Sequence, residues 1–228
     1  MEISEFKIKP ISHKEIDLIS KKCWDNRDIQ LKILDHQKIL GFAAWNDKDV
    51  CVGQLHCYSI TLPDWDNSYF PNYAKKRLED WPLGWPLLAA REKSISLNGL
   101  IWGIACFHVG LVAKSHKPDT AYFKKGLGKA LLAAAVDWAK DQRYAGVIAH
   151  GGPRPITDYN ITMGCLPWTS YNNLGFKTIA LEENGLKKTW WMKSGSLKTK
   201  TQVENALAKG AKLEDLCSRS MLLKIQKN

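Results

Sequence analysis

Two glycines stand among lysines just before an amphipathic stretch of the chain, in the segment FKKGLGKALLAAAVDWAKDQR at positions 123–143. Glycine tolerates positive φ and lets a ligand approach the main chain, so Gly126 and Gly128 favour a loop with accessible amides. The first-turn amides of a helix have no intrahelical partner, and they attract anions, phosphates above all. Positive charge is added by Lys124, Lys125 and Lys129. The segment therefore predicts a site for a diphosphate.

The amphipathic stretch has its apolar residues at helical spacing, and we expect a helix that buries them. These residues are Leu127, Leu131, Leu132, Ala135, Trp138 and Ala139. Taken alone, two glycines before a helix also fit a plain tight turn. Two other phosphate motifs are excluded by counting. A P-loop requires Gly and Ser or Thr where Phe123 and Ala130 stand, and the dinucleotide fingerprint requires a third Gly where Leu131 stands.

The segment resembles the acyl-CoA-binding motif of the GNAT superfamily of N-acetyltransferases, Arg/Gln-x-x-Gly-x-Gly/Ala followed by a helix. Gly126 and Gly128 match this motif, whereas Phe123 stands where the family usually has Arg or Gln. Three flanking segments occur in the family's order. Residues 100–110 resemble its fourth strand, residues 144–151 its fifth strand, and residues 170–180 its Tyr-x-x-x-Gly-Phe segment. The resemblance spans about residues 40 to 193.

The resemblance implies an α/β fold, with a GNAT-like mixed, mainly antiparallel central sheet of six to seven strands flanked by helices. From local patterns we expect a strand over residues 6–12, a capped helix over 12–19, a helix over 28–40 and a hairpin over 41–60. We also expect residues 178–194 to close the sheet as a hairpin that turns at Asn184 and Gly185.

One GNAT-like domain is expected over residues 1–194, followed by a lysine-rich, partly helical extension over 195–228 to which we assign no chemistry. An insert rich in aromatic residues and proline interrupts the domain at residues 61–94, with a short helix expected over 73–80. A loop of this length is commonly functional, so a lid or binding wall is weighed against a cover for one edge of the sheet.

The resemblance also implies roles for individual residues. The diphosphate of acetyl-CoA would bind Lys124, Lys125, Gly126, Leu127, Gly128 and Lys129. The pantetheine arm would pair with the backbone of Phe107, His108 and Val109 as an added strand does, and one of their amides would polarise the thioester carbonyl. Tyr171 occupies the position whose hydroxyl protonates the leaving thiolate in many family members, with a tyrosine that only packs against the sheet as the alternative.

The proton acceptor is less well marked, because the fourth strand carries none of the glutamates that the family often uses. His108 and His56 are the candidates, since histidine titrates near neutrality. Each could equally be a hydrogen-bonded core histidine.

Composition is that of a soluble globular protein, with 45% hydrophobic and 25% charged residues in 228. The net charge of +10 suits an anionic cofactor or nucleic acid, although the basic residues are dispersed. The six cysteines are scattered without a C-x-x-C pair, which predicts reduced core thiols and no metal site. The first residues lack a signal-peptide pattern, and no run reaches the roughly 18 apolar residues of a membrane helix. We therefore expect a cytoplasmic protein without a membrane partner.

Three functions are compared. The favoured one is an acyl-CoA-dependent N-acetyltransferase that moves an acetyl group from acetyl-CoA to a small-molecule or peptide amine. The alternative is a CoA-binding or sensing protein of the same fold without turnover. Nucleic-acid binding through the basic surface and the aromatic insert is least favoured, because no recognition motif accompanies the charge. A homodimer is left open.

Overall fold

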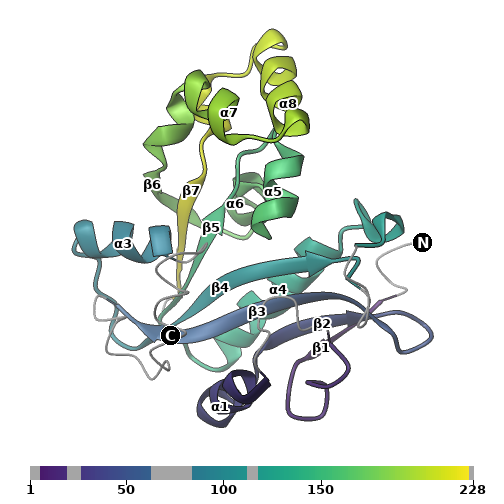
Figure 1. Ribbon diagram of the computed structural model, residues 1–228. Coiled ribbons are helices and arrows are strands. Elements are labelled where there is room, and N and C mark those ends of the chain that lie inside the picture. The colour runs from purple at the N-terminus through teal and green to yellow at the C-terminus, as the bar shows by residue number, and fades with distance from the viewer. Residues whose placement is uncertain (1–5, 20–26, 63–83, 112–117, 226–228) are drawn as a thin grey trace.

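A seven-stranded sheet organises the computed structural model, which describes residues 6–19, 27–62, 84–111 and 118–225 (Figure 1). The strand order is β1-β2-β3-β4-β5-β7-β6, in which β4 and β5 are parallel and the other neighbours are antiparallel. The strands are β1 (Lys7–Pro10), β2 (Gly41–Trp45), β3 (Cys51–Thr61), β4 (Leu100–Val109), β5 (Gly146–Gly151), β6 (Lys177–Leu181) and β7 (Arg219–Lys224). The expected α/β fold with a mixed, mainly antiparallel sheet is confirmed.

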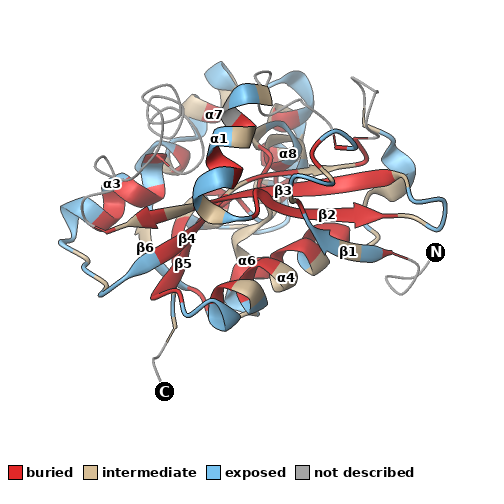
Figure 2. Ribbon diagram, turned by 90° about the horizontal axis from the view of Figure 1, so that it is seen from below, coloured by how far each residue is buried: buried red, intermediate tan, exposed pale blue. Residues whose placement is uncertain are grey.

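Helices cover both faces of the sheet. They are α1 (Arg27–Gln37), α3 (Gly84–Glu92), α4 (Leu127–Asp141), α5 (Thr157–Met163), α6 (Trp168–Asn172), α7 (Lys188–Ser194) and α8 (Leu197–Ala208). Figure 2 shows α1 and α3 on one face and α4 and α6 on the other. Side chains of a strand alternate between faces, so Ile148 of β5 packs with the core below α1 and α3, whereas Val147 and Ala149 pack with α4. The sheet thus separates two cores.

Helix α4 forms within the segment where the sequence predicts a helix, and it buries the predicted face except for Trp138, which is half-buried. Its buried residues are Leu127, Gly128, Leu131, Leu132, Ala135, Val136 and Ala139. Alanine and leucine are strong helix formers, and their small or flexible side chains let the helix lie close to the sheet. The expected strand at 6–12, helix at 28–40 and hairpin at 41–60 are likewise found as β1, α1 and the β2–β3 pair.

The helix expected from Ser12 to residue 19 is wrong, because residues 13–18 form hydrogen-bonded turns and residue 19 is a bend. The predicted cap does form, since the Ser12 amide donates to Glu15 Oε2 at 3.0 Å. The Ile16 amide donates to the Ser12 carbonyl, four residues back, at 3.1 Å, but the Leu18 amide then donates to the Glu15 carbonyl, three residues back, at 2.9 Å. The single helical turn is therefore not continued as an α-helix. The turns bury Ile16 and Ile19 against the core.

The hairpin expected over residues 178–194 is also wrong. Residues 177–181 form β6, but residues 188–194 form α7, and the partner of β6 is β7, from the region expected to be an extension. Trp191 of α7 packs with Val203 of α8 and with Leu216 in a small separate core. Strand β7 lies between β5 and β6, so the last part of the chain completes the sheet.

The insert expected at residues 61–94 ends in a regular helix, α3, rather than in an irregular loop. Residues 63–83, which include the short helix expected at 73–80, lie outside the described residues. The chain after β5 also contains a helix, α5. In the described ranges, no helix is long and apolar enough to cross a membrane.

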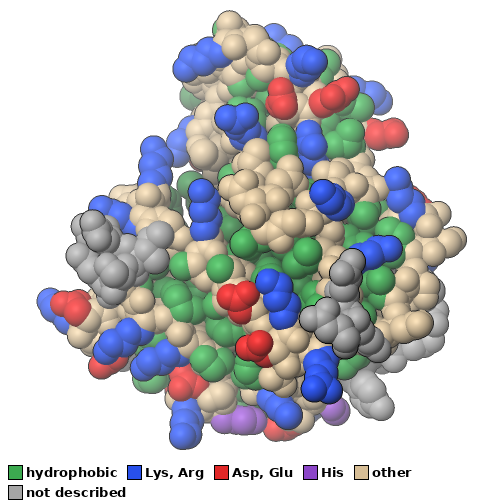
Figure 3. Space-filling view, turned by 180° about the vertical axis from the view of Figure 1, so that it is seen from behind, with side chains coloured by type: hydrophobic (Ala, Val, Ile, Leu, Met, Phe, Trp, Pro, Cys, Tyr) green, Lys and Arg blue, Asp and Glu red, His purple; other side chains and the backbone are tan. Residues whose placement is uncertain are grey.

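Cysteine pairing departs from expectation at one position. Cys51, Cys57, Cys165 and Cys217 are free and buried, as predicted, but Cys106 of β4 is disulfide-bonded, so the prediction of reduced thiols throughout is wrong. Lys and Arg side chains are spread over the face shown in Figure 3 rather than gathered in one patch.

Candidate functional site

Strands β4 and β5 part halfway along their length. Their pairing runs from Ile101 with Gly146 to Ile104 with Ala149, and both strands continue beyond it. At this point the pairing of β3 with β4 shifts register, because His56 is opposite Cys106 while the next residue of β3 is opposite Ile104. The extra residue makes a bulge in β4, and a bulge bends a strand. The result is a gap between the ends of two neighbouring strands.

Residues 164–168, here called the 164–168 segment, bridge this gap. The Phe107 amide of β4 donates to the Gly164 carbonyl at 2.7 Å. On the other side, the Gly152 amide donates to the Leu166 carbonyl at 2.8 Å, and the Trp168 amide donates to the Gly152 carbonyl at 2.9 Å. The Phe107 amide, expected to pair with a pantetheine arm, is thus already bonded within the chain.

The neighbouring amide of Val109 faces the same gap. The Gly110 amide donates to the Val52 carbonyl at 2.7 Å, so it points toward β3. Successive amides of a strand point in opposite directions, and Val109 therefore presents its amide on the edge away from β3.

The N-terminus of α4 is built as the sequence predicts. Gly126 is the N-cap residue with a φ of 81°, and no side chain caps the helix. The first intrahelical bond runs from the Ala130 amide to the Gly126 carbonyl at 3.0 Å, so the amides of residues 127–129 precede it. Lys124 and Lys129 are exposed, and Lys125 is half-buried. These unpaired donors and positive charges can hold a phosphate group.

Gly128 brings this helix end against the 164–168 segment. A Cβ at Gly128 would lie 2.7 Å from Cδ2 of Leu166, which is closer than carbon atoms normally approach. The glycine therefore serves close packing between α4 and the segment.

Tyr171 is fully buried, and its ring lies 5.4 Å from the Phe176 ring, edge to face. Burial raises the pKa of its hydroxyl well above the usual value, and the Leu166 amide beside the oxygen offsets part of the rise. The phenol is therefore protonated at neutral pH. Phe107, Gly128 and Tyr171, which are distant in the sequence, all meet the 164–168 segment.

The two candidate histidines lie together on the opposite face. Their neighbours Leu55 and Phe107 belong to the core on the α4 side, so His56 and His108 project from the face of α1 and α3. Their rings are 6.1 Å apart. Burial, with a smaller effect of His108, lowers the pKa of His56 to about 3, so this ring is neutral at physiological pH. Of the pair, His108 is the half-buried one.

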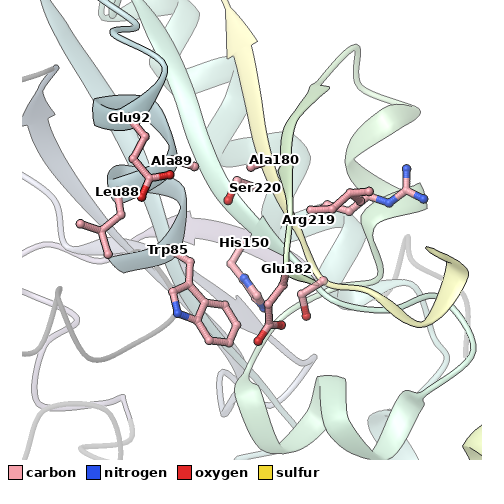
Figure 4. A pocket seen from close by; sticks show the side chains of 11 residues that line it. Trp85, Leu88, Ala89, Glu92, His150, Ala180, Glu182, Arg219 and Ser220 are labelled. Atoms are coloured by element: carbon pink, nitrogen blue, oxygen red, sulfur yellow. The ribbon is translucent and has the colours of Figure 1, made fainter. Parts of the chain in front are cut away.

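A pocket that the sequence did not predict lies on the same face, at the ends of β5, β6 and β7 beside α3 (Figure 4). Its volume is about 200 Å³, and its lining includes Trp85, Leu88, His150, Glu182, Arg219 and Ser220. The Trp85 ring packs against His150, with 5.3 Å between ring centroids. No local motif joins these residues. The sequence gives one indication of this pocket, because His150 and Glu182 each stand at the end of an apolar run that is typical of a strand.

Burial shifts the pKa values of Glu182 and His150. It raises the pKa of Glu182 to about 7 and lowers that of His150 to about 4. The Ser218 hydroxyl lies beside Glu182 and offsets part of its rise, although it does not meet the geometry of a hydrogen bond. Throughout the described part of the chain, no three His, Cys, Asp or Glu side chains are grouped to hold a metal ion.

No protein-family model and no curated protein matches the sequence. Among solved structures, one assigned as arylalkylamine N-acetyltransferase 7 of the yellow fever mosquito Aedes aegypti matches with a TM-score of 0.52 and 13% identity, over 97% of this chain and 88% of that one. Arylalkylamine N-acetyltransferase 2 of Aedes aegypti gives a TM-score of 0.48 and 12% identity, over 97% of this chain and 99% of that one.

The first of these matches has a TM-score of 0.52 and covers nearly the whole of this chain. At such low sequence identity the likeness establishes the architecture of the chain and leaves its chemistry to be argued from its own residues. The chain has the fold of the GNAT acetyltransferases.

Proposed function

We propose that this chain is an acyltransferase that moves an acetyl group from acetyl-CoA to an amine acceptor. The observation that carries the proposal is the parting of β4 and β5, because the uncapped N-terminus of α4, the amide edge of β4 and Tyr171 surround that one gap. The solved structure with the similar fold is named for acetyl transfer to arylalkylamines, which supports an amine as the acceptor.

Acetyl-CoA fits the diphosphate end of the site well. The amides of residues 127–129 and the three lysines around Gly126 supply donors and positive charge. The Phe107 amide, which we expected to pair with the pantetheine arm, already donates to the Gly164 carbonyl. In the proposal the arm pairs with the backbone at Val109, and the Val109 amide polarises the thioester carbonyl.

Acetyl-CoA supplies a thioester, which an uncharged amine can attack. The amine nitrogen bonds to the carbonyl carbon, the carbon–sulfur bond breaks, and the thiolate takes a proton. Tyr171 donates that proton, and the Leu166 amide beside its oxygen stabilises the phenolate until it is reprotonated. The proton lost by the amine passes to His108, directly or through water.

The experiment is to mix the protein with acetyl-CoA and a panel of primary amines, and to measure free thiol. Amine-dependent thiol release supports the proposal. Binding of acetyl-CoA without release by any amine supports instead a CoA-binding protein of the same fold. That second function is favoured by the bonded Phe107 amide and by the high pKa of Tyr171, which makes it a weaker acid.

A further inference from the structure

The pocket beside α3 lies next to the point where β4 and β5 part. Ala149 is the last residue of β5 that pairs with β4, and the next residue, His150, lines the pocket. Helix α4 lies on the other face of the sheet. A donor held at α4 and a molecule held in the pocket would therefore approach the same gap from opposite faces.

Glu182 is an unusual residue within this pocket. Both of its carboxylate oxygens are shielded from solvent, and neither has a hydrogen-bond partner within the described residues. An ionised carboxylate in such a place is costly unless a cation or hydrogen-bond donors meet it. The side chain is therefore suited to a positively charged ligand.

The other charged residues of the pocket do not supply the cation that Glu182 would need. The Arg219 guanidinium lies over the Trp168 ring, 3.7 Å from its centroid, and Figure 4 shows it pointing away from Glu182. The His150 ring is neutral at physiological pH because burial lowers its pKa to about 4. Glu92 on α3 adds a second negative charge to the lining. The ionised groups that face the pocket are thus acidic.

The remaining wall is apolar and aromatic. Trp85 and Leu88 of α3 are each 40% exposed and line the pocket from one side. An indole ring packs well against flat or apolar groups. The volume of about 200 Å³ is below the roughly 300–1,000 Å³ of pockets for drug-sized ligands, so the ligand must be small.

We propose that this pocket binds the acceptor as a small primary ammonium ion with an apolar or aromatic body, and that Glu182 is its counter-ion. The inference rests on the proposed function, because it assigns the pocket to the acceptor of that reaction. Glu182 acts as a specificity-determining residue, while Trp85 packs against the body of the acceptor.

Direct binding without acyl-CoA tests this assignment. The probe is 2-phenylethylamine, compared by calorimetry with 2-phenylethanol, which has nearly the same shape and no charge. We expect the wild-type protein to bind the amine at least tenfold more tightly than the alcohol at pH 8. Glu182→Gln should lose this preference and bind the two probes alike. Equal affinity of the wild-type protein for both probes, or no binding of the amine, would overturn the assignment.

Glu183→Gln is the matched control, because it removes the same charge from the adjacent, exposed residue, which does not line the pocket. It should bind the amine as the wild type does. Trp85→Leu should weaken both probes by a similar factor, since it removes the ring and leaves the charge. Amine binding that survives in Glu182→Gln, with a stable fold, contradicts the proposal.

The pH dependence gives a second readout. The titratable and charged groups around Glu182 are His150 on β5, Glu92 on α3, Tyr159 on α5, and Cys217 and Arg219 at the start of β7. Burial raises the pKa of Cys217 to about 11 and raises that of Tyr159. Because the pKa of Glu182 is about 7, amine affinity should rise between pH 6 and 8, and Glu182→Gln should abolish this rise. A flat profile in the wild-type protein would count against Glu182.

The outcomes separate this inference from the proposed function. If the amine binds through Glu182 but no thiol is released from acetyl-CoA, the acyltransferase proposal fails and the ammonium pocket stands. If thiol is released and Glu182→Gln leaves the KM for the amine unchanged, the reaction stands and the pocket assignment fails.

Discussion

The two faces of the sheet carry sites of different construction. On the α4 face, the proposed donor site uses main-chain amides at one helix end, next to a continuous segment of lysines and glycines. On the α3 face, the pocket is assembled from side chains of α3, β5, β6 and β7 and contains a carboxylate that has no hydrogen-bond partner among the described residues. A site built from main-chain amides of one segment can be recognised by a local sequence motif. A site built from side chains that are far apart in the sequence has no such motif.

The largest effect is expected from Tyr171→Phe, on the donor side. A general acid typically contributes a factor of about 100 or more, so kcat should fall by about 100-fold while acetyl-CoA affinity stays the same. Stability should fall by about 1 kcal/mol, since the Leu166 amide loses its neighbour. Steady-state kinetics and acetyl-CoA titration measure the two quantities.

Tyr144→Phe is the control for this prediction. Tyr144 is also a buried tyrosine, and its hydroxyl is hydrogen-bonded to that of Ser59, away from the 164–168 segment. It should keep the wild-type kcat. A Tyr171→Phe variant with unchanged turnover would reduce Tyr171 to a packing residue.

On the pocket side, Glu182 should make stability depend on pH. Its pKa is raised by burial from 4.5 to about 7. The unfolded chain therefore loses this proton first, and the free energy of unfolding should fall as pH rises from 4.5 through 7. The loss should be about 2 kcal/mol, after allowance for the exposed part of the side chain. Urea unfolding between pH 4.5 and 8 measures it.

Glu182→Gln should remove this part of the pH dependence and be the more stable protein at pH 8. Glu183→Gln should retain the wild-type profile, because this neighbour is exposed. Identical pH profiles for the wild type and Glu182→Gln would mean that the carboxylate is not desolvated.

A smaller effect is expected from Gly126→Ala at the helix end. Its φ of 81° lies in the left-handed region, where an alanine costs about 1 kcal/mol. We expect acetyl-CoA affinity to fall by about tenfold, because the loop relaxes and displaces the amides that hold the diphosphate. Gly210→Ala introduces the same strain at a φ of 85° with no atom within 4 Å, and it should lose the stability but keep the affinity. Equal affinity losses in the two variants would point to general destabilisation.

The smallest effect is expected from His108→Ala. If His108 accepts the proton of the amine, kcat/KM should fall several-fold and its pH profile should lose the limb that histidine ionisation produces. His13→Ala, at an exposed histidine paired with Asp35, is the control and should leave the profile unchanged. A profile that His108→Ala does not alter would remove this residue from the reaction.

Much of the fold could be predicted, because periodicity and turn residues act locally. The α4 helix and the β2–β3 hairpin have local patterns that tertiary contacts reinforce, whereas strands β4 and β5 were expected from the family resemblance. The error at residues 188–194 shows the limit. The run KKTWWMKS has β-favouring aromatic residues, yet Trp191 is buried in a core that only α8 and residues near Leu216 can complete. Long-range packing decided that element, as it decided the strand partner of β6.

The residues of the candidate site also fall into those that the sequence indicates and those that it does not. Gly126, Gly128 and the lysines could be found because the helix end they build is continuous in sequence. The bond between Phe107 and Gly164 could not, since it depends on how a loop 57 positions later crosses a bulged strand. Glu182 could not be found either, because no pattern in the adjacent sequence indicates that its oxygens are buried and, within the part of the chain that the structure describes, lack hydrogen-bond partners.

The most direct test of the central claim is the amide NMR spectrum of the protein during titration with acetyl-CoA. The account predicts that the largest shifts occur at the amides of Leu127, Gly128 and Lys129, with a further shift at Val109, as each gains a hydrogen bond to the ligand. Saturable binding that leaves these four amides unshifted, or no binding at all, would contradict it.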